Sequence, residues 1–291
     1  MKIIKYFFEF ISIISLFCIF KIIGLKNASN LGSVLGKTFG PLFRKKNIIK
    51  KNIKIGLGDI DEKKEEEIIS GMWSNIGRTF AEYIFLKDFK FNKTNFNHIK
   101  INGTNYLEQI KKSNEPVIFY SGHFANFELM AMELDKSGVK TAAIYRPLNN
   151  FFLNPLMEYL RMKYICPTQI PKGRKGMREI INRIKDGYSI ALMMDQRVSE
   201  GQKVPFFNKP AFTTTIPAQL ALKYDCKLVP ISLERKEGAN FEMTVHEQYN
   251  IEKTGNDEED TKNITLKINK IIEKMIIKNP KQWIWSHNRW K

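Results

Sequence analysis

Apolar runs and amphipathic stretches alternate along most of this chain. Buried strands are predicted at residues 116–121, 141–145, 189–195 and 227–233, where apolar side chains dominate short segments. Helices are predicted at residues 127–136 and 176–185, and around residues 264–275, where isoleucines recur at helical spacing. Strands that alternate with helices predict an α/β fold, with a largely parallel or mixed sheet flanked by helices on both faces. In such sheets ligands bind beyond the carboxyl ends of the strands.

The N-terminal segment is the most hydrophobic part of the chain. Apolar residues run from residue 3 to residue 25 and are broken only by Lys5, Glu9 and Lys21. A spanning helix needs roughly 20 such residues, so this segment is a marginal span or an interfacial helix. A signal peptide is the alternative, but Lys21 lies inside the stretch and no clear cleavage motif follows. We expect a retained membrane anchor over residues 1–25 and one catalytic domain over residues 26–291.

Positive charge is concentrated after the apolar segment. Only Lys2 and Lys5 precede its centre, whereas the downstream flank holds a run of cations: Lys37, Arg44, Lys45, Lys46, Lys50, Lys51 and Lys54. Positively charged flanks stay in the cytoplasm, so the main body is expected on that side. The same cluster is suited to contact anionic lipid headgroups.

The overall charge admits a second class of function. The 291 residues include 47 Lys and Arg against 30 Asp and Glu, which gives a net charge of +17. Part of this excess is explained equally well by a genome that favours Lys, Ile and Asn codons. A membrane-tethered nucleic-acid-binding protein would show clustered cations among exposed aromatics and no catalytic cleft. Here the lysines are spread along the chain, so we expect no nucleic-acid partner.

Cysteine usage gives no sign of a disulfide framework or a zinc site. Cys18, Cys166 and Cys226 are widely spaced and form no C-x-x-C pair. Each is flanked by apolar residues and is predicted to be a small buried side chain. No metal or redox cofactor is expected.

The segment SGHFANFE, residues 121–128, carries the most informative chemistry. It lies where the predicted strand 116–121 ends and a helix begins. His123 and Glu128 are five residues apart, about 140° around a regular helix, so they meet only if His123 lies in the loop. A carboxylate on one imidazole nitrogen leaves the other free to take a proton from an alcohol. The competing interpretation is an ordinary capping or buried histidine.

Four stretches together resemble one known family. SGHFANFE resembles the H-x4-D/E box of glycerolipid acyltransferases, in the form found in the late acyltransferases of lipid A synthesis. YRPLNN (145–150), DQRVSEGQKVPFFNKPAFTTT (195–215) and QWIWSHNRWK (282–291) resemble further motifs of that family in the same order. The resemblance covers essentially the whole chain, including the N-terminal anchor. No G-x-S-x-G, Walker A, H-E-x-x-H or G-x-G-x-x-G motif suggests another enzyme class.

The resemblance assigns roles to four residues. It implies that His123 is the general base and that Glu128 orients it. Arg161 and Asp195 match positions in the family's active site: Arg161 would bind a phosphate or stabilise an oxyanion, and Asp195 would orient that arginine or bind the acceptor sugar. An ion pair that only joins two elements remains an equal alternative for both.

The remaining site residues are expected to bind substrate. These are Arg146, Asn149, Asn126 and Gln196. Pro205, Phe206 and Phe207 are expected to form a turn and a wall of the pocket, and the loop PKGRKG (171–176) to be a solvated loop rather than a phosphate site. His287 is a poor alternative base because the sequence places no carboxylate near it.

The departures from the family motifs are small. Ala125 and Asn208 stand where the family often has glycine, and Phe127 where it often has tryptophan. These changes bear on the acceptor pocket rather than on proton transfer.

The resemblance therefore implies an acyltransferase of lipopolysaccharide biosynthesis at the bacterial inner membrane, facing the cytoplasm. The acyl donor would be acyl carrier protein or, as an alternative, acyl-CoA, with no other cofactor. The acceptor would be a hydroxyl of a lipid A precursor similar to Kdo2-lipid IVA. Another glycolipid, such as a phosphatidylinositol mannoside, is the alternative acceptor.

Overall fold

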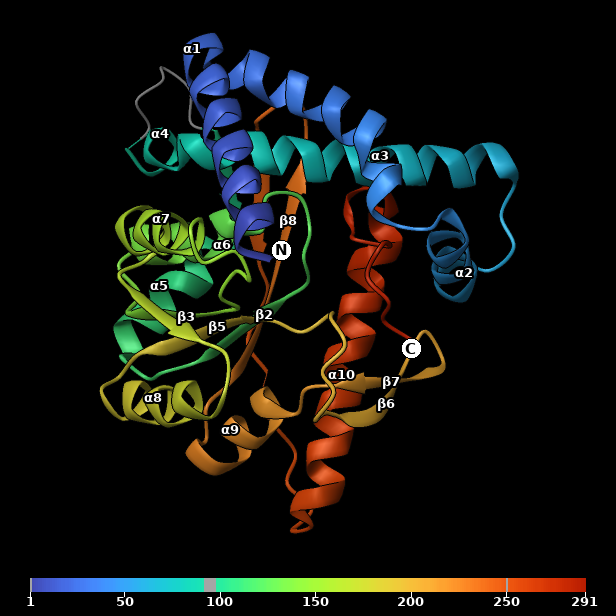
Figure 1. The fold of residues 1–291 in the computed structure, drawn as a ribbon. Helices are drawn as coiled ribbons and strands as arrows, with labels where there is room; N and C mark the ends of the chain where they lie inside the picture. The colour runs from blue at the N-terminus through green and yellow to red at the C-terminus, as the bar shows by residue number, and fades with distance from the viewer. Residues whose placement is uncertain (1, 92–97, 250) are drawn as a thin grey trace.

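A seven-stranded mixed sheet forms the centre of the protein in a computed structural model, which describes residues 2–91, 98–249 and 251–291 (Figure 1). Residue 1 of the predicted anchor and residues 92–97 and 250 of the predicted catalytic domain lie outside the described part. The strand order is β1-β9-β8-β2-β5-β3-β4. The strands are β1 (Ile99–Asn102), β2 (Ile118–Ser121), β3 (Thr141–Tyr145), β4 (Thr168–Pro171), β5 (Ser189–Met193), β8 (Leu228–Arg235) and β9 (Phe241–Val245).

Strand pairing confirms the predicted largely parallel sheet. Within it β8 and β9 pair antiparallel, and the other neighbours pair parallel. The register places Ser121 at the end of β2 beside Met193 at the end of β5. The loops that follow these two strands therefore leave the same edge of the sheet side by side.

Helices cover both faces of this sheet, as the sequence predicts. In Figure 1, α6 and α7 lie on one side of it and α8 and α9 on the other. The helices are α1 (Lys2–Phe43), α2 (Lys46–Leu57), α3 (Glu62–Glu82), α4 (Leu86–Phe91), α5 (Thr104–Ser113), α6 (Glu128–Lys136), α7 (Asn154–Leu160), α8 (Arg174–Lys185), α9 (Ile216–Tyr224) and α10 (Asp257–Lys278). Shorter turns are η1 (Tyr83–Phe85), η2 (Arg161–Ile165), which is π-helical, and η3 (Pro280–Gln282).

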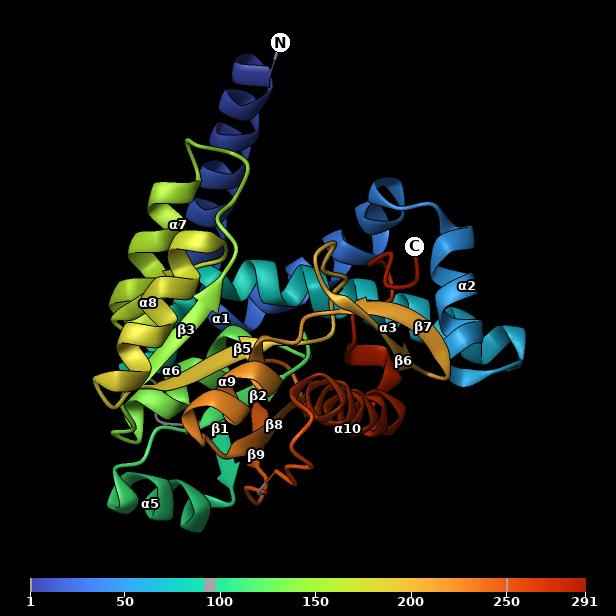
Figure 2. The ribbon, with the colours of Figure 1, turned by 90° about the horizontal axis from the view of Figure 1, so that it is seen from below.

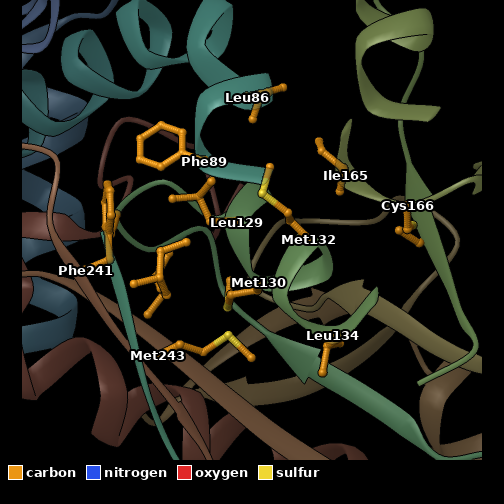
Figure 3. Packing of buried hydrophobic residues seen from close by; sticks show 14 of the residues in the cluster. Leu86, Phe89, Leu129, Met130, Met132, Leu134, Ile165, Cys166, Phe241 and Met243 are labelled. Atoms are coloured by element: carbon orange, nitrogen blue, oxygen red, sulfur yellow. The ribbon is translucent and has the colours of Figure 1, made fainter. Parts of the chain in front are cut away.

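Each face of the sheet has its own hydrophobic core, because successive side chains of a strand point to opposite faces. Phe119 of β2 belongs to one core, whereas Ile118 and Tyr120 belong to the other. The first core includes α6, whose apolar side chains lie between α4, β9 and the segment at Ile165–Cys166 (Figure 3). The second core gathers α8, α9 and α10.

A β-hairpin separate from the main sheet follows β5. It consists of β6 (Gln202–Phe206) and β7 (Lys209–Thr213), joined by Phe207 and Asn208 with φ of 51° and 58°. Two positive φ values are typical of the type I′ turn that matches the twist of a two-residue hairpin. The predicted turn is confirmed, but Phe206 and Phe207 pack against Trp290 instead of lining the pocket described below.

Helix α1 consists of two parts joined at Gly24, whose φ of 80° interrupts the helix. The first part projects away from the body of the protein (Figure 2). The second part lies along α3, where Gly32 and Gly77 let the two backbones approach so closely that a Cβ on either would collide. The kink falls one residue before the predicted end of the anchor.

The first part of α1 is long and apolar enough to cross a membrane. A window of α1 has a mean hydropathy of 2.2 and is only 11% buried. Cys18 lies on this part and is exposed, so its predicted burial is wrong. The neighbouring Phe17 and Phe20 pack against Phe80, and Cys18 lies on the opposite, outward face of the helix. Cys166 and Cys226 are buried as predicted.

Candidate active site

The loop between β2 and α6 presents His123 at the carboxyl edge of the sheet. Asp195 follows β5, the parallel neighbour of β2. Because adjacent parallel strands end at the same edge, the two residues meet although 72 positions separate them. The sequence predicts this edge as the place of the chemistry, and a cavity opens there.

Asp195 is the carboxylate that holds His123. Its Oδ1 lies 2.7 Å from His123 Nδ1, and its Oδ2 accepts a hydrogen bond from the His123 backbone N–H at 2.8 Å. Trp283 Nε1 donates to the same Oδ2 at 2.7 Å. Asp195 is only 2% exposed. These bonds fix the imidazole with Nδ1 occupied and leave Nε2 as the nitrogen available to a substrate.

The expected pairing of Glu128 with His123 is therefore wrong. His123 does lie in the loop, as required, but its ring turns toward β5 while Glu128 begins α6. Glu128 Oε1 instead accepts hydrogen bonds from Arg161 at 2.7 Å and 3.0 Å. Likewise, the expected role of Asp195 in orienting Arg161 is wrong, because Asp195 is bonded to His123. The two carboxylates have exchanged partners relative to the sequence-based hypothesis.

The interactions within the pair shift the pKa values of both His123 and Asp195. Burial alone would lower the pKa of His123, but the charge of Asp195 and its hydrogen bond outweigh burial and raise that pKa above 6.5. Burial would raise the pKa of Asp195, but His123 and Trp283 together lower it to about 2. Asp195 therefore stays ionised throughout the physiological range and stabilises positive charge on His123.

The ion pair of Glu128 and Arg161 forms a second fixed element of the site. Arg161 begins the π-helical turn η2, a type of helical irregularity frequent at functional sites. Its guanidinium lies over the rings of Tyr83 and Tyr145, at 5.9 Å and 5.4 Å from their centroids. Burial would lower the pKa of Arg161, but the carboxylate of Glu128 outweighs burial and raises it, so the cation is permanent. Among the described residues, Arg161 Nη1 has no hydrogen-bond partner.

A cavity of about 300 Å³ begins at these residues and continues into the protein. Its inner part lies between α6 and the sheet and is lined by apolar side chains: Phe119, Met130, Ala131, Leu134, Ala143, Ile165, Ala191 and Ile231. Its mouth is polar and cationic, with Arg146, Arg161, Lys172 and Arg197 beside His123. The site thus combines a proton acceptor, a slot suited to a hydrocarbon chain and a rim suited to anionic groups.

The structure divides the four expected substrate-binding residues into two pairs. Arg146 and Gln196 line the cavity. Asn149 is exposed on the loop after β3 and does not line it. Asn126 is only 1% exposed, and its Nδ2 donates to Glu82 in the interior. Substrate binding by the Asn126 side chain is therefore wrong, because that side chain is enclosed behind the loop. Substrate binding by Asn149 stays a prediction.

Two residues of the C-terminal segment belong to the site but were not predicted there. Trp283 holds Asp195, and His287 lines the cavity. Burial and the nearby positive groups lower the pKa of His287 to about 4, although Asp195 opposes this shift, so His287 is neutral at physiological pH. Of the C-terminal tryptophans, Trp283 and Trp285 are buried in the core.

The loop that carries His123 requires an unusual backbone at Ala125. This residue has φ of 48°, in the left-handed region that favours glycine, and the acyltransferases it resembles often have glycine here. Its methyl group is nevertheless buried in the first core. Relief of the left-handed strain and loss of a buried methyl group should therefore nearly cancel if glycine is introduced.

We accordingly expect Ala125→Gly to change the free energy of unfolding by no more than about 1 kcal/mol. Ala125→Val should lower it by about 2–3 kcal/mol, because a β-branched side chain both clashes and resists positive φ. Denaturant unfolding of the two variants tests this expectation. If both variants lost the same free energy of unfolding, the left-handed conformation of Ala125 would be wrong.

The comparison with known proteins agrees with the chemistry that the geometry of the site suits. The family described as bacterial lipid A biosynthesis acyltransferases matches residues 1–291. The chain belongs to this family. A lipid A biosynthesis acyltransferase of Haemophilus influenzae is 26% identical over 277 residues, which cover 88% of this chain and 83% of the relative.

Two relatives from Escherichia coli K12 are similar over comparable lengths. A lipid A biosynthesis palmitoleoyltransferase is 24% identical over 272 residues, covering 90% of this chain and 84% of the relative. A lipid A biosynthesis lauroyltransferase is 22% identical over 268 residues, with the same coverage. The chain is therefore an enzyme that transfers acyl groups in lipid A biosynthesis, and its acceptor is of the lipid A type. The nucleic-acid-binding alternative, which predicted no catalytic cleft, disagrees with both the family and the cavity.

Proposed function

We propose that this enzyme transfers a fatty acyl chain from acyl carrier protein to a hydroxyl of a tetra-acylated lipid A precursor similar to Kdo2-lipid IVA. The observation that carries the proposal is the His123–Asp195 pair at the mouth of an apolar cavity with a cationic rim. The accepting hydroxyl would belong to an acyl chain already attached to the sugar. Acyl-CoA is the alternative donor.

The proposed reaction is direct transfer. His123 Nε2 takes the proton of the acceptor hydroxyl while its oxygen attacks the thioester carbonyl. The tetrahedral intermediate then collapses, so that an ester bond forms, the thioester bond breaks, and the thiol leaves with the proton from His123. Asp195 stabilises the transient imidazolium. No step passes through an acyl-enzyme, a metal or a redox cofactor.

Arg161 would assist at an oxygen of the substrate. Arg161 lines the cavity and its Nη1 has no hydrogen-bond partner among the described residues, so a shift of the guanidinium would let a developing oxyanion or a phosphate oxygen satisfy it. Glu128 keeps the guanidinium in place. Arg146, Lys172 and Arg197 on the rim suit phosphates of the precursor or of the carrier's phosphopantetheine.

The experiment that tests the proposal supplies the detergent-solubilised protein with acyl carrier proteins of several chain lengths and the tetra-acylated precursor. One added acyl mass in the product supports it, and the same series with acyl-CoA identifies the donor. No added mass with any donor would contradict the proposed acceptor.

The inner part of the cavity would hold the donor's acyl chain. Ala131 is a small residue on α6 that faces this space. Ala131→Phe should fill part of it, so transfer of the longest accepted chain falls about 10-fold or more while the shortest accepted chain is transferred normally. Competition between donors of different length measures the shift. If Ala131→Phe left the preference for acyl-chain length unchanged, the acyl chain would have to bind outside this part of the cavity.

The protein is proposed to sit at the bacterial inner membrane with its catalytic domain in the cytoplasm. The apolar first part of α1 and the cations that follow it support this orientation. A membrane-impermeant thiol reagent should label Lys51→Cys in inverted inner-membrane vesicles. Labelling in intact spheroplasts instead would mean that the orientation is the opposite of the one proposed.

A further inference from the structure

A polar stripe on α3 holds the loop that carries His123. Asn75, Thr79 and Glu82 follow one another at spacings of four and three residues, so they share one face of the helix. Asn75 Nδ2 and Thr79 Oγ1 both donate to the carbonyl oxygen of Ala125, at 3.1 Å and 3.0 Å. Glu82 Oε2 accepts from Asn126 Nδ2 at 3.0 Å. One helix therefore forms hydrogen bonds to two consecutive residues of the loop.

A buried ion pair anchors this stripe. Glu82 is fully buried and receives both terminal nitrogens of Arg235, Nη2 at 3.0 Å and Nη1 at a shorter distance. Arg235 Nε donates to Asn75 Oδ1 at 3.1 Å and its Nη2 to Thr79 Oγ1 at 3.5 Å, so the arginine contacts all three members of the stripe on α3. Ser29 of α1 also donates to Glu82 at 2.7 Å. Isolated charges at this depth would be costly, which keeps the pair closed and its geometry rigid.

The segment that the stripe holds is strained and adjoins the catalytic pair. Ala125 has a left-handed backbone, and its N–H is held by the carbonyl of Gln282 at 3.2 Å. Two residues earlier, the backbone N–H and ring of His123 make their bonds to Asp195. If the bonds to Ala125 and Asn126 were lost, the strain would relax by moving the loop. The His123–Asp195 distance would then lengthen.

We propose that Asn75, Thr79, Glu82 and Asn126 are positioning residues, which hold the His123 loop in its left-handed turn and so set the contact between His123 and Asp195. The proposal rests on the proposed role of His123 as the base. It also explains why Asn126, part of the SGHFANFE segment, points into the protein rather than into the cavity. The alternative is a stripe that only stabilises the fold.

Conservative substitutions separate the two interpretations. Thr79→Val removes the donor to Ala125 and the long bond accepted from Arg235 with little change in shape, and Thr79→Ser restores both. Asn126→Ala breaks the link to Glu82 but leaves the bonds of Glu82 to Arg235 and Ser29. Ser33→Ala is the matched control, because Ser33 bonds Ser74 across the same α1–α3 interface at 2.7 Å without reaching the loop.

In the acyl-transfer assay, kcat should fall about 10- to 100-fold in Thr79→Val and Asn126→Ala, since small displacements of a reacting group have effects of this size. Thr79→Ser should stay near wild type, and Ser33→Ala should lower Tm without changing kcat. NMR titration should show the pKa of His123 falling in Thr79→Val, because the contact with Asp195 is what raises it.

The outcomes distinguish this proposal from the proposed function. If Thr79→Val keeps the wild-type kcat and the wild-type pKa of His123, or if Thr79→Ser is equally impaired, the stripe does not position the loop. The same holds if kcat falls in Ser33→Ala in proportion to Tm. If the wild type makes no product, the proposed function fails, whereas the titration of His123 still decides the positioning role.

Discussion

Replacement of His123 by alanine is expected to lower kcat about 10²- to 10⁴-fold while the protein stays folded. The magnitude is that of general-base catalysis, and His123 is the side chain at the cavity mouth with a buried carboxylate on one nitrogen. The measurement is the rate of acyl addition to the lipid A precursor at saturating donor.

The folded state of this variant needs its own check, because Asp195 is buried and loses its cationic partner. Thermal unfolding of His123→Ala and of His123→Gln, which keeps a polar side chain, provides that check. A folded His123→Ala variant with a normal rate would mean that another group takes the proton.

Replacement of Asp195 by asparagine should have the next largest effect, a loss of about 10²- to 10⁴-fold in kcat. The amide keeps the shape and can still bond Trp283 or the backbone of His123, but it no longer stabilises the imidazolium. The measurement is the same initial rate, with KM for the precursor determined alongside. If Asp195 only positioned groups for substrate binding, KM would rise and kcat would stay near wild type.

The fold class and the centre of the sheet were predictable from the hydrophobic pattern alone. The strands at residues 116–121, 141–145, 189–195 and 227–233 correspond to β2, β3, β5 and β8, which are four consecutive strands at the centre of the sheet. Most of their side chains are buried, so they read as apolar runs. β1 and β4 were missed because edge strands of four residues carry too little pattern, and β9 alternates with polar residues.

The place of the site was also predictable, but its internal pairing was not. Local spacing suggested that His123 should meet Glu128, five residues away. In the folded chain, the parallel pairing of β2 with β5 brings Asp195 closer than the start of α6 can bring Glu128. Contacts across a sheet depend on strand order, and strand order is not contained in the spacing of a motif.

The same reason explains the missed residues. Trp283 and His287 reach the site from the end of the chain, after α10. The tryptophan-rich segment was marked in the sequence only by its resemblance to a family motif. Its hydrogen bond to Asp195 required the fold.

The most direct test of this account is the pH dependence of kcat/KM in the wild type, Asp195→Asn and Glu128→Gln. A base acts when deprotonated, so kcat/KM should fall as the pH drops through the pKa of His123, which lies above 6.5 in the wild type. In Asp195→Asn, the midpoint should move down to about 6.5 or below, since burial then acts without the opposing carboxylate. In Glu128→Gln, the midpoint should move much less, whatever the loss of rate. If Glu128→Gln shifted the midpoint and Asp195→Asn left it in place, Glu128 would be the partner of His123, and the catalytic pair described here would be wrong.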